Sequence, residues 1–142
     1  MSNKTKHTNW GSYPLVQGDL IDFQDASMFP ANAYIPRGNG RSYGDASLGS
    51  TMFSMLTHAG EVSLNKEEAT VTCKAGTLLA EVLKVIFPEG FFLPLVPGTK
   101  YITIGGAIGC DIHGKNHEAP SPTRERPHDA GNRHRPSQKF RC

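Results

Sequence analysis

Short apolar stretches bounded by polar, glycine or proline positions predict strands in the first two thirds of the chain. The three clearest stretches are residues 33–36, 61–64 and 70–74. The last one alternates, with Val71 and Cys73 on one face and Thr72 and Lys74 on the other. This period of two is typical of a strand with one buried face.

A helical spacing follows directly after the third of these strands. The apolar stripe consists of Leu78, Leu79, Val82, Leu83 and Ile86. Thr77 precedes the stripe, and its hydroxyl is predicted to cap the first turn, whereas Pro88 and Gly90 are predicted to end the helix. The dense apolar run at residues 91–95 is expected to be buried.

The two ends of the chain lack such patterns. Residues 1–12 are polar and are predicted to be a flexible lead-in, so the folded part is expected to span residues 13–117. Residues 118–142 hold four prolines, six Lys or Arg and three acids, with Phe140 as the only large apolar side chain. This composition predicts a disordered tail. It also resembles out-of-frame translation of a GC-rich gene.

Composition adds few constraints. A length of 142 residues suits one modest domain, and a net charge of +2 gives no general argument for a nucleic-acid partner. The basic tail has no interleaved aromatic residues to stack on bases, so specific nucleic-acid binding is not expected. The three cysteines form no CxxC pair. The spacing of the cysteines is typical of reduced thiols rather than of a disulfide framework. The sequence shows no apolar leader and no membrane-spanning run, so a cytoplasmic location is expected.

The first chemically suggestive feature is the glycine-rich segment at residues 36–46. It reads Pro36, Arg37, Gly38, Asn39, Gly40, Arg41, Ser42, Tyr43, Gly44, Asp45 and Ala46. Its glycines permit positive φ, and successive N–H groups in such a loop can form an anion-binding nest. Arg37, Arg41 and Ser42 could add donors. The Rossmann pattern fails because Tyr43 stands at its last glycine position and no clean helix pattern follows. A glycine-rich surface turn remains the alternative.

The second such segment is residues 97–117. Gly105, Gly106 and Gly109 clear space beside the backbone for a planar group or a phosphate, and His113 and Lys115 follow them. A zinc site is not expected, because HGKNH lacks the glutamate of HExxH and no third ligand is apparent.

At these segments the chain resembles the vanillyl-alcohol oxidase family, whose FAD domain is called PCMH-type after para-cresol methylhydroxylase. The resemblance rests on RGNGRSYGD, LPLVPGT and TIGGAIGCDIHGKNH, and it covers about residues 30–117. It implies an α+β fold in which FAD lies between two small sheet-based subdomains. Because the match ends near residue 117, we expect only the N-terminal part of that domain.

The resemblance also implies roles for particular residues. Residues 36–46 would form the pyrophosphate loop, and the rest of FAD would be lined by Gly98, Thr103, Ile104, Gly105, Gly106, Cys110, Asp111, Ile112 and His113. Lys115 and His113 would be the catalytic residues that face the flavin edge or the substrate. Some members of the family link FAD covalently to a histidine in the first loop. Tyr43 stands there in this chain, which implies non-covalent FAD.

The expected function is therefore FAD-dependent oxidation of an alcohol group of a sugar or polyol, with that small molecule as the partner. The catalytic base is left unassigned. The alternative is a non-catalytic remnant that binds FAD weakly or not at all. Because the chain is expected to lack part of its domain, exposed apolar surface predicts self-association.

Overall fold

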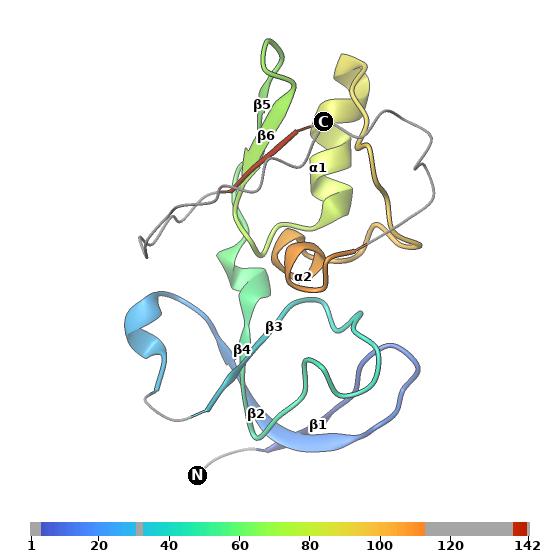
Figure 1. The fold of residues 1–142 in the computed structure, drawn as a ribbon. Helices are drawn as coiled ribbons and strands as arrows, with labels where there is room; N and C mark the ends of the chain where they lie inside the picture. The colour runs from blue at the N-terminus through green and yellow to red at the C-terminus, as the bar shows by residue number, and fades with distance from the viewer. Residues whose placement is uncertain (1–3, 31–32, 113–137, 142) are drawn as a thin grey trace.

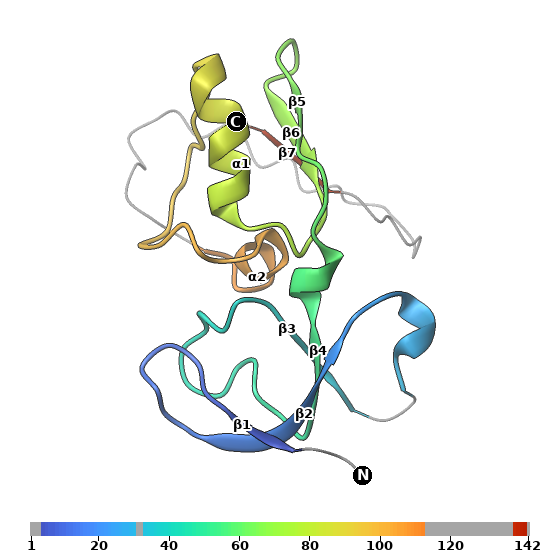
Figure 2. The same ribbon diagram turned by 180° about the vertical axis from the view of Figure 1, so that it is seen from behind.

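The computed structural model describes residues 4–30, 33–112 and 138–141, and these residues form two lobes (Figure 1). The first lobe contains the strands β1 (Thr5–His7), β2 (Val16–Asp22), β3 (Ile35–Arg37) and β4 (Thr51–Ser54). The second contains β5 (Ser63–Asn65), β6 (Thr70–Cys73), β7 (Gln138–Arg141) and helix α1 (Leu79–Ile86). Helix α2 (Ile104–Gly109) lies between the lobes in both views (Figures 1 and 2). The expected α+β fold is confirmed.

The sheet of the first lobe has the strand order β1-β2-β4-β3. β1 and β2 are antiparallel, whereas β2, β4 and β3 are parallel. In the register of the parallel strands, Ser54 pairs with both Asp22 and Arg37, so all three strands end at the same edge of the sheet. The carboxyl edge of parallel strands is where α/β folds usually place ligands, and the segment after β3 begins there.

The connections of this lobe include two 3₁₀ helices, η1 (Ala26–Met28) and η2 (Met55–His58). The ring of Phe29 stacks on that of Tyr34, with centroids 4.3 Å apart, and both rings contact the edge or face of Phe53. Met52 and Phe53 on β4 are buried. These apolar side chains anchor the central strand, which leads through η2 into the second lobe.

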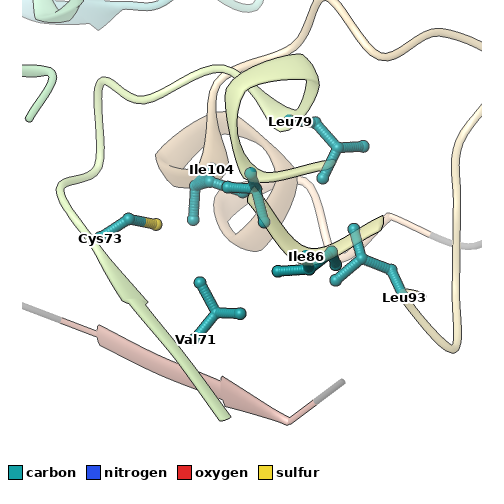
Figure 3. Close-up of a cluster of buried hydrophobic side chains, with 7 residues drawn as sticks. Val71, Cys73, Leu79, Ile86, Leu93 and Ile104 are labelled. Atoms are coloured by element: carbon teal, nitrogen blue, oxygen red, sulfur yellow. The ribbon is translucent and has the colours of Figure 1, made fainter. Parts of the chain in front are cut away.

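The second lobe buries its own core between the antiparallel sheet β5-β6-β7 and the two α-helices. Figure 3 shows side chains from β6, α1 and α2 facing one another. The buried members of this core are Val71, Cys73, Leu79, Val82, Ile86, Leu93 and Ile104. Burial of such an aliphatic side chain stabilises a fold by about 1.5–3 kcal/mol. The predicted strand at residues 70–74 and the predicted helix are confirmed. Of the run at residues 91–95, however, only Leu93 is buried.

The start of α1 differs from the sequence prediction. The capping residue is Leu78, whose N–H donates to Glu81 Oε2 at 2.7 Å. Thr77 is completely buried, and its hydroxyl has no hydrogen-bond partner among the residues that the structure describes. The preference for threonine at a cap was outweighed here because Thr77 is held inside, with its carbonyl accepting from Ile104 N. The C-terminal end of α1 agrees with the prediction. The 3₁₀ helix η3 (Phe87–Glu89) follows α1 and contains Pro88, and Gly90 after it has φ +80°.

This assignment makes a testable prediction. Thr77→Val should raise the free energy of unfolding by up to about 1 kcal/mol, because it removes a buried hydroxyl that makes no hydrogen bond. Thr103→Val is the matched control: Thr103 Oγ1 accepts from Gly106 N and caps α2, so this change should cost about 1 kcal/mol. Urea unfolding followed by circular dichroism measures both. If Thr77→Val lost as much stability as the control, the hydroxyl of Thr77 would cap α1 after all.

Both ends of the chain differ from expectation where the structure describes them. Within the predicted lead-in, β1 pairs with β2 from Thr5↔Gly18 to His7↔Val16. Within the predicted disordered tail, β7 pairs with β6 from Thr70↔Arg141 to Cys73↔Gln138. Both strands join a sheet edge through backbone hydrogen bonds, which need no apolar pattern, so composition did not reveal them. Residues 118–137 and 142 of the predicted tail lie outside the described residues.

An open groove lies beside α1 and η3 on the second lobe. Its lining residues are Ala80, Leu83, Lys84, Phe87, Pro88, Phe92 and Lys100. Phe87 and Phe92 are exposed there. Self-association through such surface stays a prediction. None of the helices among the described residues is long and apolar enough to cross a membrane.

Candidate cofactor site

The structure brings the two glycine-rich segments into direct contact. A Cβ on Gly38 would lie 2.4 Å from Thr103 Oγ1, so the backbone of the first segment rests against the cap of α2. One residue later, Asn39 Nδ2 donates to the carbonyl oxygen of Tyr101 at 2.8 Å. These contacts join positions more than 60 residues apart. The prediction that both segments belong to one site therefore has a geometric basis.

The fold positions this contact at the carboxyl edge of the parallel strands. Pro36 and Arg37 are the last residues of β3, and residues 38–46 form the loop that follows it. In both ribbon views this loop lies beside α2 (Figures 1 and 2). The loop and α2 thus face each other at the junction of the two lobes.

The loop keeps its backbone donors unused. Within the described part of the chain, no backbone N–H of residues 39–46 donates a hydrogen bond to another residue. Gly40 and Gly44 have φ of +63° and +55°, which turns the chain tightly. A loop with unpaired N–H groups and left-handed turns is suited to bind an anion such as a pyrophosphate.

Unlike the loop, the first turn of α2 has its backbone N–H groups bound to other groups of the protein. Ile104 N donates to Thr77 O, Gly105 N to Ala75 O, and Gly106 N to the hydroxyl of Thr103. This helix start is therefore occupied by the turn that precedes α1. We infer that α2 offers a surface, through exposed Gly106 and Gly109, rather than a set of free donors.

Arg37 does not fit the expectation of a phosphate donor. Its side chain is only 9% exposed, and its guanidinium donates to Asn9 Oδ1 (2.5 Å), Ser47 O (3.0 Å) and Thr8 O (2.7 Å). Burial lowers the pKa of Arg37, since the charged form loses hydration. The same group explains Gly40: a Cβ there would lie 2.6 Å from Arg37 Nη2. The absence of a side chain at Gly40 thus makes room for the guanidinium of Arg37.

Residues 8–10 take part in the site, although the sequence prediction had them in a flexible lead-in. Asn9 Nδ2 donates to Gly44 O at 3.1 Å, and Trp10 N donates to Ser42 O at 3.1 Å. Arg41 lies over the Trp10 ring, 5.5 Å from its centroid. Trp10, the one aromatic side chain in an otherwise polar segment, was the only residue there that stood out in the sequence.

The outer face of the loop is open to solvent. Arg41, Tyr43, Asp45 and Ala46 are exposed, and the side chain of Tyr43 is 82% exposed. A packed structural role for Tyr43 is therefore excluded within the described residues. This open face leaves room for a ligand beside the loop.

The second segment continues from α2 to the last described residues before the gap. Cys110 and Asp111 are exposed, Asp111 has φ +44°, and Ile112 N donates to Ala107 O at 3.1 Å. Gly98 is exposed, and a Cβ there would meet nothing within 4 Å. His113 and Lys115, the predicted catalytic residues, lie outside the described residues.

The part of the chain that the structure describes indicates neither a metal site nor a reactive role for Cys73. The described ranges hold no group of three or more His, Cys, Asp or Glu side chains that could bind a metal ion. Cys73 belongs to the core of the second lobe, and burial raises the pKa of its thiol. Cys73 is therefore a packing residue.

Comparison with known proteins agrees with this geometry. A family model described as "FAD binding domain" matches residues 30–127. Decaprenylphosphoryl-beta-D-ribose oxidase of Mycolicibacterium smegmatis is 42% identical over 87 residues, which cover 60% of this chain and 19% of that protein. An uncharacterized protein of Streptomyces coelicolor is 44% identical over 39 residues, or 28% of this chain and 11% of its own length. The chain thus spans about a fifth or less of these relatives.

Among solved structures, cholesterol oxidase from Brevibacterium sterolicum is similar with a TM-score of 0.66 at 16% identity, over 78% of this chain and 24% of that one. At this identity the likeness shows the fold, which is that of a PCMH-type FAD-binding domain. The family model covers more than half of the chain and includes both glycine-rich segments. The chain therefore belongs to the FAD binding domain family, and its cofactor is FAD.

Proposed function

We propose that this chain is the FAD-holding part of a flavin-dependent oxidoreductase that oxidises an alcohol group of a sugar or polyol. The observation that carries the proposal is the contact of Gly38 and Asn39 with Thr103 and Tyr101. It sets a loop with unused N–H groups against the exposed glycines of α2. A pyrophosphate and a flat ring system joined to it would fit these two surfaces.

The hydrogen-bond donors that remain unused indicate which residues would bind which part of FAD. Residues 39–46 would hold the pyrophosphate through backbone N–H groups, with exposed Arg41 as an added cation. Gly98, Gly106 and Cys110 would line the remainder of FAD, because they are exposed on the second segment. Arg37 would not contact the cofactor, since its guanidinium is already bound within the protein.

The chemistry would combine the cofactor with residues of the second segment. When bound, the flavin ring supplies the hydride acceptor for oxidation of a carbinol to a carbonyl. The substrate hydroxyl must lose a proton to a base, which we do not assign. Lys115 and His113 follow Ile112 closely in the chain. From the family resemblance they would face the flavin edge or the substrate. A cation there would stabilise negative charge that develops on the flavin.

The name of the Mycolicibacterium relative, a ribose oxidase, favours an alcohol group of a sugar as the group that is oxidised. The alternative is a remnant that holds FAD but oxidises nothing. Anaerobic addition of pentoses and polyols to the FAD-loaded chain separates the two. Bleaching of the flavin absorbance near 450 nm would support the oxidoreductase, and unchanged absorbance would support the remnant.

The binding claim is tested by equilibrium dialysis of the full chain against FAD and riboflavin. Because riboflavin lacks the pyrophosphate, the loop predicts that FAD is retained at least about tenfold more tightly, a difference of about 1.4 kcal/mol. Equal retention of the two, or retention of neither, would contradict the proposed use of the loop.

Non-covalent attachment is a separate prediction. The family resemblance implies that Tyr43 stands where some members carry the histidine of the flavin linkage. Its exposed phenol is not expected to form that bond. Acid precipitation of the FAD-loaded chain should therefore leave all the flavin in the supernatant. Flavin mass on the denatured chain, measured by mass spectrometry, would show the prediction to be wrong.

A further inference from the structure

A buried polar cluster lies under the cofactor loop. It consists of Arg37, Asn9 and Ser47, which are 9%, 5% and 7% exposed. Asn9 Oδ1 accepts from Arg37 Nη1 at 2.5 Å and from Ser47 Oγ at 2.8 Å. Arg37 Nη1 also reaches Ser47 O, so each member contacts the other two. A buried guanidinium loses hydration, and these bonds compensate for that loss only while they all hold.

The cluster connects the N-terminal segment to both ends of the loop. Arg37 precedes the loop and Ser47 follows it, while Asn9 Nδ2 donates to Gly44 O in between. Trp10 N adds a bond to Ser42 O, and Arg37 Nη2 donates to Thr8 O. The loop carbonyls at Ser42 and Gly44 are thus fixed from one side by residues 9 and 10.

Fixing the carbonyls of a glycine loop also orients its N–H groups, because each peptide plane carries both. The amide of Asp45 shares a peptide plane with the carbonyl of Gly44, and the amide of Tyr43 shares one with Ser42. Gly40 and Gly44 would otherwise give this loop wide conformational freedom. A clamp at these carbonyls therefore sets the conformation that an anion meets.

From this geometry we propose that residues 8–10 are a clamp that positions the pyrophosphate loop for FAD, with Asn9 and Arg37 as positioning residues that do not touch the cofactor. The proposal rests on the proposed function, because it assumes that the loop binds FAD. It adds that FAD affinity depends on an N-terminal segment outside residues 30–127, the part that the family model matches.

Asn9→Asp is the discriminating variant. The aspartate keeps an oxygen for Arg37 and Ser47, and it gives Arg37 an ionised partner, so the buried cluster is retained. Its second oxygen replaces the Nδ2 that donates to Gly44 O, which removes that bond and opposes two oxygen atoms. The change therefore releases the loop while the lobe beneath it stays intact.

Two readouts on the full chain test the clamp. In hydrogen exchange without FAD, Asn9→Asp should raise exchange at the two amides that anchor the loop, Trp10 N on Ser42 O and Leu48 N on Asp45 O, and leave α1 unchanged. In dialysis, its Kd for FAD should rise about tenfold, the effect expected from one lost hydrogen bond to a site-forming group. Unchanged loop exchange, or a wild-type Kd, would overturn the proposal.

Controls separate the clamp from general stability and from the proposed function. Phe53→Leu weakens the aromatic cluster of the same lobe without touching the polar cluster. If FAD affinity fell equally in this variant, the clamp would be refuted. Wild-type chain that retains no FAD would refute the proposed function instead, and loop exchange would still decide whether Asn9 fixes the loop. If Asn9→Asp did not fold, Ser47→Ala would decide: it removes one bond to Asn9 and should raise the Kd about threefold, whereas no change would overturn the clamp.

Discussion

Gly38→Ala is expected to weaken FAD binding at least about thirtyfold, which corresponds to about 2 kcal/mol. The added Cβ would lie 2.4 Å from Thr103 Oγ1 and 3.1 Å from Thr103 Cγ2. Thr103 is buried and caps α2, so it cannot move away without loss of that cap. The loop must therefore separate from α2, and the two surfaces proposed to hold FAD no longer meet.

A double-mutant cycle tests this cause directly. Thr103→Ala removes both atoms that the new Cβ would strike, and the remaining Thr103 Cβ lies 3.3 Å away. The double variant should recover part of the FAD affinity lost in Gly38→Ala, although it lacks the cap. Dialysis of the wild type, both single variants and the double variant gives the coupling energy. Strictly additive losses would mean that the contact of Gly38 with Thr103 does not control binding.

Gly76→Ala is expected to have the largest effect on stability, a loss of about 3 kcal/mol or more from overpacking against rigid backbone. A Cβ there would lie 1.8 Å from Met55 O and 2.7 Å from His58 O. Gly76 N also donates to His58 O at 3.1 Å. This close approach joins η2, which follows the first lobe, to the turn that leads into α1. Neither backbone can yield without disturbing both lobes.

Gly60→Ala provides the matched control for that substitution. Its Cβ would also meet a neighbour closely, 2.9 Å from Lys74 Cδ, but the neighbour is a flexible side chain that can rotate away. We expect a cost below about 1 kcal/mol for this variant. Urea unfolding of both variants measures the difference. Equal stabilities for Gly76→Ala and Gly60→Ala would show that the backbone does not pack tightly around Gly76.

The sequence predicted the parts of the fold that have a regular period. The alternation at Val71 and Cys73 and the helical stripe from Leu79 to Ile86 both lie in the core, as expected. The sheet of the first lobe was largely missed, because Val16–Asp22 places polar residues on both faces and Thr51–Ser54 is very short. Its strands are identified by their pairing with one another, which a local pattern cannot reveal.

Helix α2 was missed for a different reason. Three of its six residues are glycines, and a glycine costs a helix about 1 kcal/mol relative to alanine. The cap by Thr103 and the bonds from Ile104 N and Gly105 N to the turn before α1 compensate for this cost. These bonds join segments about 30 residues apart. Only the three-dimensional structure could show them.

The sequence indicated the two segments of the candidate site, but it did not reveal that Arg37 is buried beneath the first of them. Glycine clustering and the family resemblance indicated both segments, and the structure brings them together. A buried Arg37 cannot be distinguished by sequence from an exposed one, since the same residue type suits both a phosphate and a carbonyl. Asn9 and Trp10 lie nearly 30 residues before the loop and follow no period, so nothing local connected them to it.

Hydrogen exchange of the full chain with and without FAD tests whether the two glycine-rich segments form one cofactor site. If the two glycine-rich segments hold the cofactor together, FAD should slow exchange at residues 39–46 and at residues 98–112 and leave β5 unchanged. Protection that is absent, or confined to one of the two segments, would show that the two segments do not hold FAD together.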